Sequence, residues 1–207
     1  MDTPELSPCK DFHLSPGRFC CPLPAHMADT PDIVYFDLET QRSSGDVGGW
    51  NNKDRMGMSI GVTYSTRLGE YRIYREKQAD RLVDQLIRAD LVVGFNHIWF
   101  DYKVLQAYTI LDLESQTRNL DLMLDLETQL GYKPSLDGIA QSTLGLGKTA
   151  EGLQAIVWFR QGKWREIAEY CAYDVKVTMR VHEYGRRHGH VKFSDKNGRE
   201  HQIPVTW

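Results

Sequence analysis

The stretch Ile33–Thr40 reads IVYFDLET, and it decides the fold. Its β-branched and aromatic residues are typical of a central strand. Side chains two positions apart share a strand face, so Asp37 and Glu39 point together, whereas Val34, Phe36 and Leu38 point the other way. Two acids on an apolar strand are costly unless positive charge meets them, and Mg²⁺ or Mn²⁺ accepts carboxylate oxygens. An acid pair facing solvent at the end of a strand explains this motif equally well when it is taken alone.

The segments after this strand alternate between strand and helix patterns. Strands are predicted at 58–65, 70–75, 91–96 and 119–127, and helices near 82–87 and at 101–109, 135–145 and 164–187. A turn sequence, Asp-Lys-Asn-Gly, interrupts the alternating tail 191–205 and indicates a hairpin. This order predicts an α/β domain in which helices flank a mixed β-sheet, with a C-terminal β-hairpin.

The composition divides the chain into three parts. Residues 1–30 are proline-rich without apolar periodicity and are predicted to be a disordered leader; 31–189 form the domain and 190–207 the appended hairpin. The cysteines suggest no disulfide framework, and neither a secretory signal nor a membrane-length apolar run is present, so we expect a cytoplasmic protein with no membrane partner. The net charge of −3 does not exclude nucleic acid, because bound cations would reverse the sign at an acidic cluster.

Two further acidic elements occur later in the sequence. Asp101 follows a buried-type strand and opens the next helix, where an acid is also ordinary capping chemistry. Tyr170 and Asp174 stand four positions apart on the long helix and therefore share a face beside its apolar stripe. Each element has a structural explanation of its own. Their combination favours one acidic centre.

These three elements resemble the motifs of the DEDD (DnaQ-like) exonuclease superfamily, over most of residues 33–185. The first motif is Phe36–Thr40, the second is Asn96–Asp101 and the third is Tyr170–Asp174. The tyrosine is similar to the DEDDy subclass, since the histidine subclass would need histidine where Glu169 stands. The segment Ser135–Ala140 is similar to a helix of RNase D-type members. Gly45–Trp50 and the tail hairpin look more like the YprB-type branch, which often accompanies helicases.

The resemblance implies a ribonuclease H-like fold and a 3′→5′ exonuclease that hydrolyses terminal phosphodiesters with two divalent cations, Mg²⁺ or Mn²⁺. It implies that Asp37 bridges both ions, that Glu39 and Asp174 bind the ion on the nucleophile side, and that Asp101 helps to hold the other. The phenol of Tyr170 would orient the attacking water, because its ordinary pKa near ~10 disfavours a base at neutral pH.

The expected partner is nucleic acid with a 3′ end, with single-stranded DNA slightly favoured over RNA, and a helicase is a second candidate partner. Side chains expected to contact nucleic acid are Thr40, Asn96, His97, Trp99 and Lys148. The segment Gly145–Thr149 is not interpreted as a nucleotide-binding loop, because Ser142 stands where that motif needs glycine. The alternatives are an endonuclease on the same fold and a catalytically silent nucleic-acid-binding module acting with a helicase.

Overall fold

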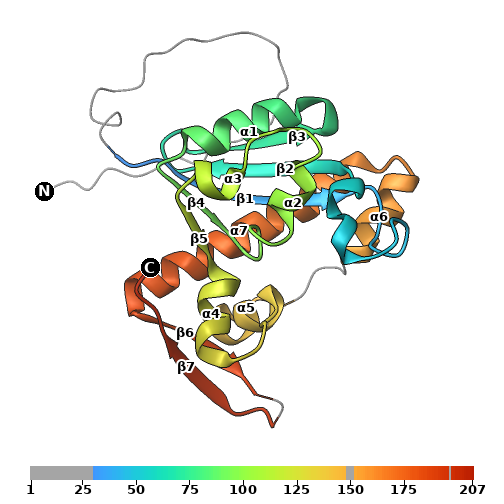
Figure 1. Ribbon diagram of the computed structural model, residues 1–207. Coiled ribbons are helices and arrows are strands. Elements are labelled where there is room, and N and C mark those ends of the chain that lie inside the picture. The colour runs from blue at the N-terminus through green and yellow to red at the C-terminus, as the bar shows by residue number, and fades with distance from the viewer. Residues whose placement is uncertain (1–29, 148–151, 196) are drawn as a thin grey trace, which may run out of the picture.

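The computed structural model describes residues 30–147, 152–195 and 197–207, so nearly all of the predicted leader lies outside the described residues. A five-stranded sheet in the order β3-β2-β1-β4-β5 forms its centre (Figure 1). Strand β2 is antiparallel to β1 and β3, whereas β4 is parallel to β1 and β5 to β4, which confirms the mixed sheet. The strands are β1 (Ile33–Thr40), β2 (Met58–Ser65), β3 (Glu70–Arg75), β4 (Leu91–Gly94) and β5 (Asn119–Asp121), followed by the hairpin β6 (His190–Ser194) and β7 (Glu200–Pro204).

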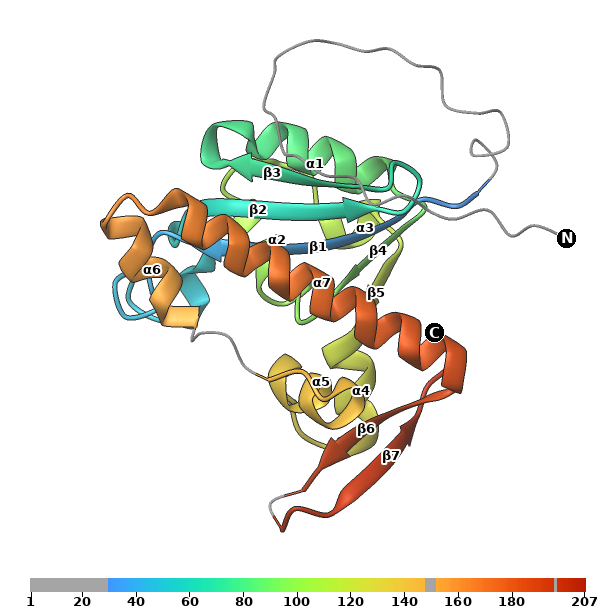
Figure 2. The ribbon, with the colours of Figure 1, turned by 180° about the vertical axis from the view of Figure 1, so that it is seen from behind.

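Helices cover both faces of the sheet. The long helix α7 runs across one face, and α1 lies on the other side (Figure 2). None of the helices described is long and apolar enough to cross a membrane. The helices are α1 (Ala79–Arg88), α2 (Asp101–Leu105), α3 (Leu113–Gln116), α4 (Leu122–Leu130), α5 (Leu136–Leu144), α6 (Gly152–Arg160) and α7 (Trp164–His188), with 3-10 turns η2 (Trp50–Arg55) and η3 (Glu76–Gln78).

Alternation along β1 divides the core into two clusters. Tyr35 packs with Ile167 and Val175 of α7, whereas Phe36 packs in the opposite cluster with Leu86 of α1 and with Tyr102. Because side chains alternate along a strand, Asp37 and Glu39 share the face of Tyr35 and therefore point toward α7. The strand thus brings the predicted acid pair to the helix that carries Asp174.

The short neighbour of β1 opens space at its carboxyl end. Along β1, strand β4 pairs with Ile33, Val34 and Tyr35 only, so the second half of β1 extends beyond the end of β4. A backbone N–H left without a strand partner needs another acceptor. The N–H of Leu38 donates to Oδ1 of Asp101 at 3.0 Å, and the first residue of α2 thereby takes the place of the missing strand.

Three expectations about secondary structure differ from the structure. The predicted strand 119–127 ends at Asp121, whose side chain accepts from the N–H groups of Met123 and Leu124 and caps α4. The helix expected at 101–109 spans only Asp101–Leu105, and α6 was not predicted. The tail hairpin is present, and it packs into the domain through Val191, Ile203 and Val205 in the α7 cluster.

Candidate metal centre and cleft

Three of the predicted acids converge on one point. Asp37 and Glu39 of β1 and Asp174 of α7 each offer a carboxylate oxygen within 4.8 Å of the other two. These half-buried residues come from two elements separated by more than a hundred positions in sequence. The strand and the helix therefore build a cluster of negative charge beside the sheet, where mutual repulsion disfavours full ionisation.

Asp101 lies next to this cluster but outside the group of three. Its side chain is 3% exposed, and the hydrogen bond to Leu38 holds one of its oxygens. Burial raises its pKa well above the ordinary range, and the charge of Asp37 raises it further. The fourth predicted acid is thus within electrostatic reach of the first, with its orientation fixed by the backbone of β1.

Burial and mutual repulsion perturb the other acids in the same direction. Burial is the largest cause of the raised pKa of Asp37 and of Glu39, followed by Asp174 for the former and by Asp37 for the latter. Burial also raises the pKa of Asp174 to about 7. A half-buried group of carboxylates with raised pKa values and no ion pair among the described residues fits hard divalent cations, which bind oxygen ligands.

Two residues that sequence reasoning missed act on this cluster. Asp137 of α5 is close enough to raise the pKa of Asp174 further. Its position in the first turn of a helix offered only an ordinary charge–dipole signal. The thiol of Cys171 donates to the carbonyl oxygen and to Oδ2 of Asp37, each at 3.3 Å. A buried cysteine on an apolar stripe carries no sequence signal for this role.

Tyr170 lies beside Asp174 as the helical spacing predicts. Its hydroxyl is close enough to lower the pKa of the Asp174 carboxyl and so partly offsets the effect of burial. The pKa of Tyr170 itself is raised, mainly by burial and then by Asp174 and Glu39. The ring packs edge-on against Trp158 of α6, with centroids 6.1 Å apart. Tyr170 is therefore a fixed and protonated hydrogen-bond donor at neutral pH.

A sharp turn after β4 carries the second motif. Asn96 adopts a left-handed conformation with φ of 67°, and its N–H donates to Oδ1 of Asp121 at 2.7 Å. The other oxygen of Asp121 accepts from the N–H of Ile98. The same carboxylate thus caps α4 and anchors the loop that leads to Asp101. The side-chain oxygen Oδ1 of Asn96 is buried without a hydrogen-bond partner.

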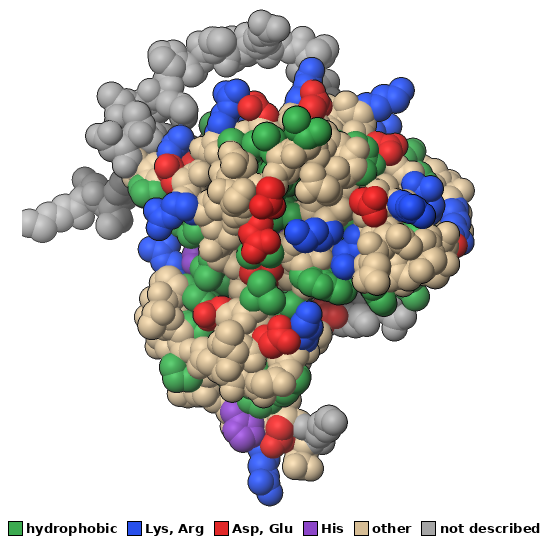
Figure 3. All heavy atoms as spheres, viewed as in Figure 1, with side chains coloured by type: hydrophobic (Ala, Val, Ile, Leu, Met, Phe, Trp, Pro, Cys, Tyr) green, Lys and Arg blue, Asp and Glu red, His purple; other side chains and the backbone are tan. Residues whose placement is uncertain are grey.

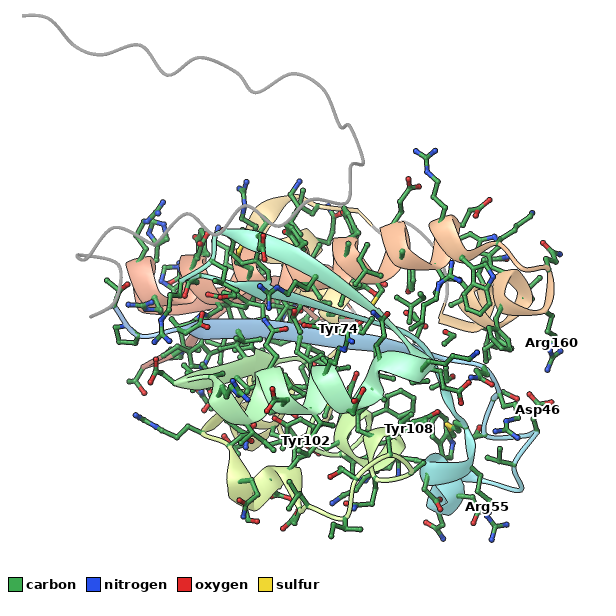
Figure 4. All side chains as sticks on the ribbon, turned by 90° about the horizontal axis from the view of Figure 1, so that it is seen from above. Asp46, Arg55, Tyr74, Tyr102, Tyr108 and Arg160 are labelled. Carbon is green, nitrogen blue, oxygen red and sulfur yellow. The ribbon has the colours of Figure 1, made fainter. Side chains whose placement is uncertain are left out.

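A cleft of about 540 Å³ opens beside the acids. Its polar side includes Asp37, Glu39 and Asp101, and its apolar side includes Trp50 and Leu153. The loop that carries Trp50 and the helix that carries Leu153 are joined by an ion pair of 3.0 Å between Asp46 and Arg160. Figure 4 shows these two residues next to each other at one end of the sheet. The cleft thus places an apolar surface opposite the acidic cluster.

The five expected nucleic-acid contacts have different surroundings. Thr40 and Asn96 line the cleft, and Trp99 is 39% exposed near it. His97 is 0% exposed and its Nε2 lies 3.1 Å from Oδ1 of Asn119, so its side chain supports the loop and offers no surface for a base. The expected contact by His97 is therefore corrected to a supporting role. Lys148 lies outside the described residues.

Comparison with known proteins gives a family match and a structural likeness. The family model described as RNase_H superfamily matches residues 34–185. A solved structure of the family B DNA polymerase from the hyperthermophilic archaeon Pyrobaculum calidifontis is similar, with a TM-score of 0.56 and 16% sequence identity. The likeness covers 75% of this chain and 24% of the polymerase chain, and it shows the fold. No curated protein matches the sequence.

Proposed function

Because the chain belongs to the RNase H superfamily, we propose that it is a metal-dependent 3′→5′ exonuclease of the DEDDy type. The observation that carries this proposal is the convergence of Asp37, Glu39 and Asp174 within 4.8 Å, with Asp101 beside them in an open cleft. Such a cluster suits a reaction in which bound cations offset the negative charge of a phosphodiester. The YprB-type branch remains part of the same prediction.

The carboxylates would hold two divalent cations, Mg²⁺ or Mn²⁺. Asp37, whose charge acts on both Glu39 and Asp101, would contact both ions; Glu39 and Asp174 would share one, and Asp101 would help to hold the second. Bound cations would supply positive charge that activates water and stabilises the leaving oxygen. Cys171 positions the Asp37 carboxylate, and Leu38 positions that of Asp101.

Tyr170 and the cleft residues would place the substrate and the attacking water. The phenol lies beside the carboxylates, and its raised pKa keeps the proton on this hydroxyl at neutral pH, where it would donate to the attacking water. Trp50 and Leu153 would give a terminal base an apolar surface, and Asn96 lines the same cleft. These groups would position the phosphodiester and the attacking water, and they would form no covalent bond with the substrate.

The experiment that tests the proposal compares three labelled single strands: a linear one, a linear one with a blocked 3′ end, and a circle. The expected result is stepwise shortening of the unblocked linear strand from its 3′ end with Mg²⁺ or Mn²⁺, and none with EDTA. Cutting of the circle would favour the endonuclease alternative. Binding without hydrolysis of any strand, across both metals, would favour the silent module and overturn the proposal.

The substitution Tyr170→Phe is expected to lower kcat by about 10- to 100-fold with little change in KM, because the hydroxyl that would orient the attacking water is removed while the ring remains. The phenyl ring keeps the packing against Trp158. Tyr173→Phe is the matched control, since the Tyr173 hydroxyl donates to the carbonyl of Gly147 at 3.3 Å. Steady-state hydrolysis of a labelled oligonucleotide measures both. A wild-type kcat in Tyr170→Phe would refute the orienting role and leave the metal centre intact.

The preferred partner in this proposal is the 3′ end of a single strand, with DNA slightly favoured over RNA. A parallel assay on DNA and RNA of the same sequence decides between them. A helicase that delivers such an end fits the same reaction and remains a prediction. Cytoplasmic localisation and the three-part division at residues 30 and 189 are predictions of the same kind.

A further inference from the structure

Two tryptophans and a group of lysines lie beside the cleft, outside the acidic cluster. Trp50 is 55% exposed and Trp99 is 39% exposed, and their ring centroids are 5.9 Å apart. Nζ of Lys53 lies 3.6 Å from the centroid of the Trp99 ring, and Nζ of Lys133 lies 4.7 Å from it. These four residues come from three separate loops, and we call them the tryptophan–lysine platform.

The positive charges of the platform lack acidic partners. Within the described ranges, no carboxylate lies within ion-pair distance of Lys53, Lys133 or Lys103, whereas several arginines elsewhere pair with acids. Burial lowers the pKa of Lys53, and Lys103 and Lys133 lower it further. Ammonium groups that repel each other across an exposed aromatic ring form a surface that an anion would stabilise.

The platform is continuous with the cleft. Trp50 lines the cleft and also contacts Trp99, and Phe100 lies at the same border, with its ring 6.3 Å from that of Trp50. Figure 3 shows Lys and Arg side chains near α2 on this face, among others that lie along its top and left edges. A chain that leaves the cleft past Trp50 therefore reaches exposed aromatic rings and ammonium groups together.

We propose that the tryptophan–lysine platform is a second binding site, which holds the single-stranded nucleic acid that leads into the cleft. Bases stack on the exposed ring of Trp50, phosphates lie against the exposed Lys133, and Lys53, which is 8% exposed, holds the Trp99 ring in place from below its surface. This combination of stacking surfaces and backbone cations binds strands without reading their sequence. The inference rests on the proposed function, because it assigns the strand upstream of the hydrolysed end.

The test measures binding in an Asp174→Asn background with Mg²⁺, by fluorescence anisotropy of a trinucleotide and of a longer single strand. Trp50→Leu and Lys133→Glu are each expected to weaken binding of the longer strand by about 10-fold. Lys133→Glu, which lies outside the cleft, is expected to change binding of the trinucleotide by less than about two-fold. Lys133→Glu should also reduce the slope of log affinity against log salt by about 1 or more. DNA and RNA strands are compared in parallel arms, and the tighter one identifies the ligand.

The control is Arg187→Glu, which makes the same change of charge at an exposed position near the far end of α7. It is expected to bind both oligonucleotides like the parent. In the active protein, Lys133→Glu is expected to raise KM for the longer strand with kcat unchanged. Lys133 is exposed in a loop, so its variant keeps the inference testable should Trp50→Leu unfold.

The outcomes separate the inference from the proposed function. Hydrolysis by the wild type together with unchanged strand binding in Trp50→Leu and Lys133→Glu would overturn the platform alone. An equal loss in Arg187→Glu would also overturn it, since the effect would then come from net charge. Wild-type protein that neither hydrolyses nor binds any strand would refute the proposed function and, with it, the platform.

Discussion

The substitution Asp37→Asn is expected to lower the rate of phosphodiester hydrolysis by at least about 10³-fold. Asp37 is one of the three acids that converge, and its charge raises the pKa values of Glu39, Asp101 and Cys171. Loss of its charge would weaken the sites of both cations, whose charge stabilisation is worth several kcal/mol, at about 1.4 kcal/mol for each tenfold in rate.

The measurement is single-turnover hydrolysis of a labelled single strand at saturating Mg²⁺ or Mn²⁺. The matched control is Asp84→Asn, which makes the same chemical change in an exposed i,i+4 ion pair on α1. Asp84→Asn should hydrolyse the strand at the wild-type rate. Activity of Asp37→Asn within tenfold of the wild type, in a folded protein, would rule out Asp37 as the shared ligand.

The second large effect is a loss of stability of the metal-free protein as the pH rises. The pKa of Asp174 is raised from 3.8 to about 7, and those of Asp37, Glu39 and Asp101 are raised in the same direction. The folded state therefore holds protons that the unfolded state releases. Their contribution to stability is fully present below pH 3.8 and is lost as the pH rises through about 7.

Thermal unfolding in EDTA at pH 5 and pH 8 measures this loss, and Asp174→Asn is the matched variant. The midpoint of the wild type should fall more than that of Asp174→Asn, by an amount equivalent to ~1–4 kcal/mol. His182 acts in the opposite sense, because burial lowers its pKa to about 4, and its contribution cancels in the difference between the two proteins. Equal pH dependence in both proteins would contradict the assignment.

Metal ions should reverse the effect, since they bind the ionised carboxylates of the folded state. Addition of Mg²⁺ or Mn²⁺ at pH 8 is expected to raise the midpoint of the wild type, with a smaller rise at pH 5 and a smaller rise for Asp174→Asn. A shift of equal size at both pH values and in both proteins would indicate binding elsewhere.

Local sequence patterns predicted those features whose geometry is set within a single strand or helix. The alternation in Ile33–Thr40 placed Asp37 and Glu39 on one face, and the helical spacing placed Tyr170 beside Asp174. The mixed sheet and the hairpin were also predicted, because strand and turn residues follow each other in a recognisable order. The assignment of the acids to metal sites stays a prediction.

Parts that depend on contacts between distant segments were missed. The apolar run after Asn119 fits a strand and a helix equally well, and only the side chain of Asp121, folded back onto the N–H groups of Met123 and Leu124, decides for a helix. The buried side chain of His97 is held by a contact with Asn119, which lies 22 positions away in the sequence. Lys53 and Lys133 meet at Trp99 through loops with no periodic pattern.

The hydrogen bond between Asp101 and the N–H of Leu38 has a consequence for anyone who wants to trap this protein with an intact substrate. Leu38 stands between Asp37 and Glu39, so a change at Asp101 disturbs the scaffold of two other acids as well as its own charge. Asp174 has no such bond to the sheet among its described contacts, and it approaches the cluster from a separate helix. A substitution at Asp174 should therefore leave the backbone of β1 and the other acids in position. For crystals with an uncut strand, Asp174 is a better position to substitute than Asp101.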